Sequence, residues 1–231
     1  MDQTDFDISA LSYDEFVEYF FTASGTGAFR LDPNGNEYIF ARNYEPQVTL
    51  RHLTRLCTEF LQLSERLSQE SLCIGITGIL SHAFFELQRI LWDHAVPLEQ
   101  RVHCIRSMYR VFADYVANCK MEVMENCFFM WWELVCNSFW SERTDTWKIP
   151  LKKYEELSGE DRALLDAMFE TLVQILNLDD DRSKSAALHG MGHLHHPGVR
   201  RVVQEFITAH SHGLPPDGLK WLEDCRDGSV M

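Results

Sequence analysis

The sequence predicts an all-α fold in which antiparallel helix pairs stack on one another. Apolar residues recur every three or four positions over most of the chain after Pro46, and this spacing is the period of an α-helix. Pro97 and Pro197 each stand just past one helical segment and at the start of the next, where a missing backbone N–H is tolerated. The helical segments arrive in pairs, over residues 47–94, 98–140 and 159–196, and Pro197 opens a further pair.

Composition limits the class of protein. The 231 residues are 45% hydrophobic, which is enough material for a large core in one domain or two small ones. The formal net charge of −14 argues against nucleic acid or an anionic membrane as the main partner, because both are negatively charged. No uncharged apolar run is long enough to cross a bilayer, and the acidic N-terminus lacks the regions of a secretory signal. We therefore expect a cytoplasmic protein.

The cysteines predict reduced thiols and not a disulfide framework. Their number is odd, none forms a Cys-x-x-Cys pair, and most lie within apolar helical patterns. They are Cys57, Cys73, Cys104, Cys119, Cys127, Cys136 and Cys225.

Residues 1–45 are expected to form an N-terminal part that packs on the main domain. The segment from Ser12 to Glu15 reads as a capping box, and the helix that it opens should end near Thr22. Over residues 29–41, Asn34-Gly35 separates two short alternations of apolar and polar residues. This segment could be a small hairpin, which Asn-Gly favours, or an ordered loop.

Residues 46–231 are expected to form the helical main domain. Its most apolar segment is Glu122–Trp140, and a helix that is apolar on all sides is a buried one. Ser158 should cap one of the later helices, and the acidic corner at residues 179–181 should cap the next. The expected helices are Gln47–Leu67, Ser71–His94, Leu98–Cys119, Glu122–Trp140, Gly159 to about Leu178, Ser183–His195, one opening at Pro197, and a short one after Pro216.

One stretch resembles a known repeat family. Residues 185–194 read Ser-Ala-Ala-Leu-His-Gly-Met-Gly-His-Leu, which is similar to the Ala-x-x-x-Leu-Gly second helix of a HEAT repeat. Pro197, Val199 and Val202 then look like the opening of the next repeat. The likeness is specific over residues 183–207, is one of period and pattern over residues 46–182, and does not cover residues 1–45.

The resemblance to HEAT and armadillo proteins implies an α-α superhelix. In such a stack, the second helices of successive pairs line a concave surface that binds a partner. Each helix pair has two apolar faces and cannot bury both alone, so pairs stack in sequence. An irregular helical bundle of similar content is the alternative fold.

Several polar residues are candidates for the concave face. His189, His193 and His196 follow at i, i+4 and i+7, so they should share one face of their helix. A second stripe lies in Ser71–His94, and two glutamates of Glu122–Trp140 could face the same groove. These further candidates are His82, Glu86, Arg89, Asp93, Glu125 and Glu133.

Two functions follow from these patterns. The first is a non-enzymatic protein-binding or scaffold module that uses no cofactor and whose partner could be basic, given the net charge. The second is a metal-dependent enzyme in which His189, His193 and His196 bind an ion together with carboxylates from neighbouring helices.

Histidines near a helix C-terminus also serve simply to cap carbonyls. No histidine is followed by glutamate, so the His-Glu dipeptides of the HEAT-like deoxyhypusine hydroxylases are not present, and HEAT-like DNA glycosylases need a basic groove.

Overall fold

A computed structural model describes residues 8–21, 44–80, 87–119, 125–143, 153–210, 212 and 214–230. Throughout these residues the secondary structure is helical, without a strand, so the predicted all-α class is confirmed. The hairpin or loop expected over residues 29–41 lies outside the described residues.

The N-terminal part begins with a short 3-10 helix, η1 (Ile8–Ala10), and α1 (Tyr13–Phe21). The predicted capping box is confirmed. The Ser12 backbone N–H donates to Glu15 Oε2 at 2.8 Å, and the Glu15 N–H donates to Ser12 Oγ at 3.4 Å. α1 packs on α4 (Gln69–Leu80), where Gly75 leaves room for the ring of Phe21.

Three helices lie side by side in a first row: α2 (Pro46–Thr58), α5 (Leu98–Arg110) and α8 (Gly159–Leu176). The expected helix Gln47–Leu67 is interrupted at Glu59, which ends α2 and precedes α3 (Phe60–Arg66). α5 continues into a π-helical turn, η3 (Val111–Tyr115), and a 3-10 turn, η4 (Val116–Asn118).

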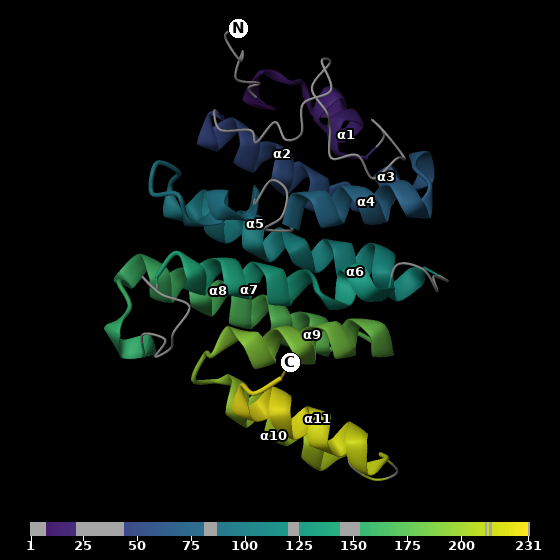
Figure 1. The fold of residues 1–231 in the computed structure, drawn as a ribbon, viewed down its shortest axis with the longest axis vertical. Coiled ribbons are helices and arrows are strands. Elements are labelled where there is room, and N and C mark those ends of the chain that lie inside the picture. The colour runs from purple at the N-terminus through teal and green to yellow at the C-terminus, as the bar shows by residue number, and fades with distance from the viewer. Residues whose placement is uncertain are drawn as a thin grey trace, which may run out of the picture.

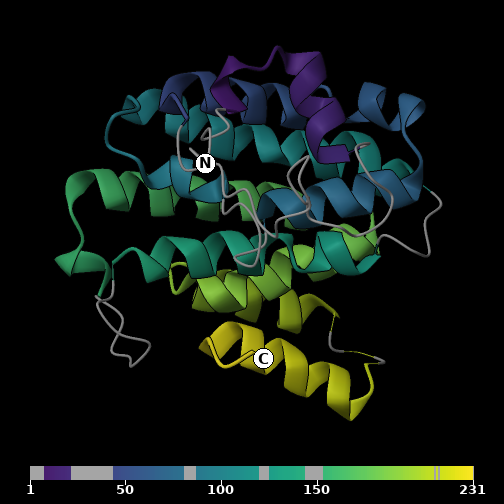
Figure 2. The same ribbon diagram turned by 45° about the horizontal axis from the view of Figure 1, so that its top comes forward.

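A second row contains α4, α7 (Trp131–Ser141), α9 (Asp181–Leu194) and α11 (Pro216–Asp227), with each helix in contact with the next. The short α6 (Glu125–Phe129) precedes α7 and also contacts α9. α8 packs on α9, and α10 (Val199–His210) packs on α11. Figures 1 and 2 show these helices layered along the long axis of the molecule in chain order, with α10 and α11 at the end opposite α1.

The expected helix Ser71–His94 is wrong in its second half. α4 ends at Leu80 within the described residues, and Leu87–Trp92 is a 3-10 helix, η2, that stops before Asp93. A further 3-10 turn, η5 (Tyr154–Glu156), precedes α8. In the part of the chain that is described, no helix has the length and hydropathy that crossing a bilayer requires.

α7 is buried, as the apolar run predicts, but the expected single helix Glu122–Trp140 is interrupted at Met130, which separates α6 from α7. Trp131 and Trp132 are 2% and 0% exposed, and the Trp140 indole N–H donates to the Leu194 carbonyl at the end of α9. α9 approaches α7 closely, because Gly190 carries no side chain at the contact. A Cβ there would lie 2.4 Å from Cβ of Trp132.

The capping predictions for α8 and α9 are confirmed. Ser158 Oγ accepts from the Asp161 N–H at 3.1 Å, and Asp180 Oδ2 accepts from the Ser183 N–H at 2.8 Å. α9 therefore starts at Asp181, two residues earlier than expected. None of the seven cysteines forms a disulfide.

Candidate metal centre

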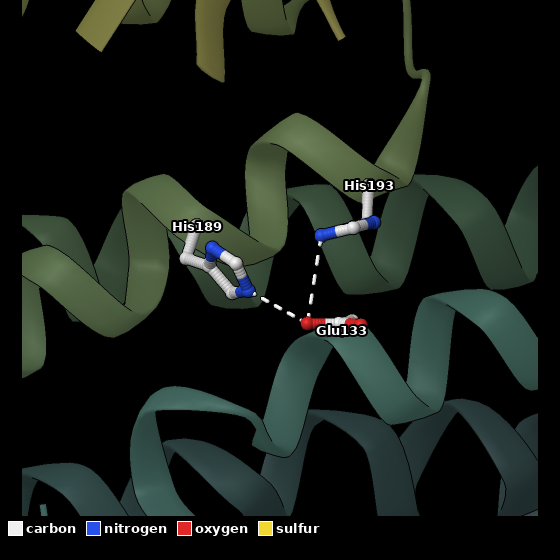
Figure 3. A group of neighbouring side chains, drawn as sticks. All are labelled: Glu133, His189 and His193. Carbon is white, nitrogen blue, oxygen red and sulfur yellow. Dashed lines mark hydrogen bonds and ion pairs between the residues drawn. The ribbon is translucent and has the colours of Figure 1, made fainter. Parts of the chain in front are cut away.

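α7 and α9 bring three of the predicted residues together. His189 Nε2 lies 2.8 Å from Glu133 Oε2, and His193 Nε2 lies 3.6 Å from the same oxygen. One ligand atom of each residue lies within 4.8 Å of the others. Figure 3 shows both imidazoles of α9 pointing at the single carboxylate on α7. The structure thus supplies the carboxylate from a neighbouring helix that the metal hypothesis requires.

The local sequence explains this convergence. His189 and His193 are one turn apart on α9, so their side chains project from the same face. Gly190 lies next to His189 and lets the backbone of α9 approach Trp132, the neighbour of Glu133 in sequence. The short distance between the helices is what places a glutamate side chain within reach of both rings.

The site is largely shielded from water. The His189 side chain is 2% exposed, that of His193 15% and that of Glu133 19%. Phe129 stacks on the His189 imidazole with 4.2 Å between the ring centres, and the Asn137 side-chain amide contacts Glu133 Oε1 at 3.5 Å. Shielding of this kind strengthens electrostatic interactions among the three residues.

The site leaves two ring nitrogens without a partner. His189 Nδ1 and His193 Nε2 are both buried and have no hydrogen-bond partner. Burial lowers the pKa of His193 below its ordinary value and outweighs the opposing attraction of Glu133. The His193 ring is therefore neutral near pH 7, and one of its nitrogens carries a free lone pair.

The neighbouring thiol does not join the cluster. Cys136 is buried, and its Sγ donates to the Gly190 carbonyl at 3.7 Å. Burial raises its pKa far above the ordinary value, and the Glu133 charge adds to this effect. Cys136 therefore remains a protonated thiol, which is a poor metal ligand.

The prediction that His196 shares the face of His189 and His193 is wrong. α9 ends at Leu194, and His195 adopts a left-handed conformation with φ of 53°, which turns the chain away. His196 Nε2 then contacts Asp166 Oδ1 of α8 at 3.1 Å, while its Nδ1 accepts from the Gly198 N–H. Both ring nitrogens are satisfied. Burial lowers its pKa despite the nearby Asp166 carboxylate.

The other predicted residues do not join this site. Arg89, on η2, pairs with Glu142 at 2.6 Å, and Asp93 accepts from the Ala95 N–H at 2.8 Å. They therefore do not form a stripe on one α-helix. Glu125 opens α6, and its side chain lies outside the described structure, as do His82 and Glu86.

Sequence reasoning missed the surroundings of the site. Phe129 belongs to the apolar run Glu122–Trp140, for which a buried helix is expected, yet it stacks on His189 and also lines an open pocket of about 430 Å³ with Asn126, Asp181, Arg182 and Ser185. Asn137 follows Glu133 at i+4, a spacing that could have indicated their contact.

No protein-family model, no curated protein and no solved structure matches this chain.

Proposed function

We propose that the chain is a HEAT-like helical stack that binds a basic protein partner. The observation that carries this proposal is the ordered layering of the helices, in which α5 contacts both α2 and α8, and α9 contacts both α7 and α11. Successive stacking of this kind extends a surface in one direction, and such a surface suits a protein partner better than a small molecule.

The distribution of charge supports a basic partner. Taken together, the four helices of the second row contain seven aspartates and glutamates against four lysines and arginines, whereas α2, α5 and α8 together contain five against six. The acidic excess of the second row comes mainly from α11, since α9 by itself is basic. The second row is the one that would line a concave face in a HEAT-like stack. Its exposed carboxylates include Glu70, Asp181, Asp217 and Asp227.

The apolar surface is small in the described part of the chain. The exposed large hydrophobic residues there are Leu61 and Leu214, at 42% and 39%. A partner held mainly by hydrophobic contacts would require a contiguous apolar patch. We therefore expect binding in which charge complementarity speeds association and in which added salt weakens the complex.

Affinity capture from a native lysate of the source organism tests the proposal. We expect a stoichiometric basic protein at about 10 mM salt, where the Debye length is roughly 30 Å, and its release near 1 M salt, where it is roughly 3 Å. Isothermal titration with the purified partner should show weaker binding for Glu70→Gln/Asp217→Asn. The matched control, Glu99→Gln/Glu205→Gln, removes the same number of charges from α5 and α10. Salt-independent capture, an acidic partner, or equal effects of the two double variants would contradict the proposal.

A further inference from the structure

Hydrogen bonding accounts for only part of the Glu133 cluster. His189 can donate from Nε2 to Glu133 Oε2 across 2.8 Å, which satisfies that nitrogen of the ring but not Nδ1. His193 Nε2 faces the same oxygen at 3.6 Å, is buried, and has no hydrogen-bond partner. Buried polar atoms are nearly always satisfied, and an exception of this kind indicates a bound water or ion.

A metal ion would account for all three side chains. Zinc bonds to imidazole nitrogen and carboxylate oxygen at about 2.0–2.2 Å, so neighbouring ligand atoms in a tetrahedral site lie roughly 3.3 Å apart. The distances of 2.8 and 3.6 Å from Glu133 Oε2 to the two Nε2 atoms fall on either side of this value. Small side-chain rotations would bring the set to ligand geometry, since its atoms already lie within 4.8 Å of one another.

We propose that Glu133, His189 and His193 bind a zinc ion through the carboxylate and the two Nε2 atoms, with water in the fourth position. Two imidazoles favour zinc over magnesium or calcium, which prefer oxygen ligands. Two histidines with one carboxylate also suit ferrous iron, but divalent zinc binds nitrogen and oxygen ligands more tightly than ferrous iron does. The proposal is independent of the protein partner, because it concerns only the contact between α7 and α9.

The surroundings of the ligands predict moderate affinity. Phe129 stacks on His189 and restricts the rotation of that ring, which prepares the site for the ion. Zinc binding through Nε2, however, leaves the proton on His189 Nδ1, which is buried without an acceptor. A metal-bound histidine whose second ring N–H lacks a hydrogen-bond acceptor binds the metal about 10–100-fold more weakly. Strong chelators should therefore remove the zinc ion from this site.

Zinc titration of the full chain tests the proposal. The protein is purified without a metal-affinity tag, stripped with a chelator, and titrated with zinc chloride by calorimetry. We expect one zinc ion per chain and a thermal midpoint that rises with zinc concentration, because the ion binds only the folded state. Cobalt(II) should bind at the same site and give a visible spectrum of a four-coordinate ion without thiolate charge transfer. Ferrous iron, titrated anaerobically, should bind more weakly than zinc.

Variants separate this site from adventitious binding. His193→Ala and Glu133→Gln each remove a direct ligand. Each should therefore lower zinc affinity by more than the roughly 10–100-fold effect of losing a residue that only hydrogen-bonds to a ligand. His193 is partly exposed, so its loss should leave the helical circular dichroism unchanged. The matched control is His196→Ala, which removes another histidine–carboxylate pair but touches no atom of the cluster.

Three results would overturn the proposal. They are a stoichiometry well below one zinc per chain, a cobalt spectrum dominated by thiolate ligands, and equal loss of affinity in His193→Ala and His196→Ala. If Glu133→Gln fails to fold, the cobalt spectrum of the unaltered protein still decides between a nitrogen and oxygen site and a cysteine site.

Discussion

Arg143 and Asp161 form an ion pair where α7 ends and α8 begins. The Arg143 guanidinium donates to Asp161 Oδ1 and to the Phe139 carbonyl, and it lies 3.7 Å from the centre of the Phe139 ring. The two side chains are 8% and 16% exposed. Burial alone would raise the pKa of Asp161, but the Arg143 hydrogen bond and charge, together with Ser158, outweigh burial and lower it.

This pair predicts a defined response to acid. Because the folded pKa of Asp161 lies below its ordinary value, the pair contributes stability above about pH 4, and this contribution is lost as the pH falls through the folded pKa. Asp161→Asn should lower the free energy of unfolding by about 1.5–3 kcal/mol at pH 7. The difference from the unaltered protein should shrink below about pH 4.

Urea unfolding at pH 7, 5 and 3 measures this effect. Glu170→Gln is the matched control. Glu170 lies on α8, as Asp161 does, and pairs with Arg106 of α5 at 2.8 Å, but both side chains of that pair are about half exposed. An exposed pair contributes only about 0.2–1 kcal/mol. If the two substitutions lowered the free energy of unfolding equally at pH 7, burial would not be what makes the Arg143–Asp161 pair the stronger one.

Residue-scale prediction succeeded where helix spacing alone decides the outcome. His189 and His193 are one turn apart within α9, and the structure keeps them on one face with Glu133. His196 failed because its place depends on where α9 ends. The expected helix already stopped at His195, but the left-handed conformation of His195, which is not a glycine, was not predicted, and it directs His196 toward Asp166 of α8.

At the scale of elements, the approach of α9 to α7 determines the geometry of the candidate site. Gly190→Ala would place a Cβ 2.4 Å from Cβ of Trp132 and 3.1 Å from Cδ2 of Leu172. The Trp132 Cβ is fixed to the backbone of α7, so the helices must separate. Overpacking of this kind costs about 1–3 kcal/mol, and separation should also weaken zinc binding by Glu133.

Gly159→Ala provides the control for this prediction. A Cβ at Gly159 would meet no atom within 4 Å, and the position lies in the first turn of α8. The substitution should be neutral or stabilise by about 0.4–1 kcal/mol, because alanine restricts the unfolded chain. Urea midpoints for the two variants measure the difference. A Gly190→Ala protein as stable as Gly159→Ala would show that α7 and α9 can separate without cost.

Helix existence was predictable from the spacing of apolar residues, but helix interruptions were not. α3, which follows the interruption at Glu59, packs on η3, a contact between segments about 50 residues apart that local spacing cannot reveal. Similarly, η2 contacts α2, α4, α5 and α7, and this packing accompanies its 3-10 conformation. Intrinsic helix propensity is a weak guide where tertiary contacts of this kind are made.

At the scale of the whole molecule, stability should vary along the stack. α5 and α8 lie in the interior, and each packs on helices to both sides. α10 and α11 lie at one end (Figure 1), and the buried residues of α11 are Leu222 and Cys225. When each unit contacts mainly its neighbours, the end units open at lower free energy than the interior.

Hydrogen exchange tests this gradient. Amides of α10 and α11 should exchange faster than those of α5 and α8. Leu222→Ala should accelerate exchange in α10 and α11 alone, whereas Leu165→Ala, at a fully buried position of α8, should lower protection along the whole chain. Each truncation removes roughly 2–5 kcal/mol from the unit that it affects. If Leu222→Ala lowered protection equally in α5 and α8, the described helices would unfold as one cooperative unit, and a stack stabilised by nearest neighbours would be the wrong description of this fold.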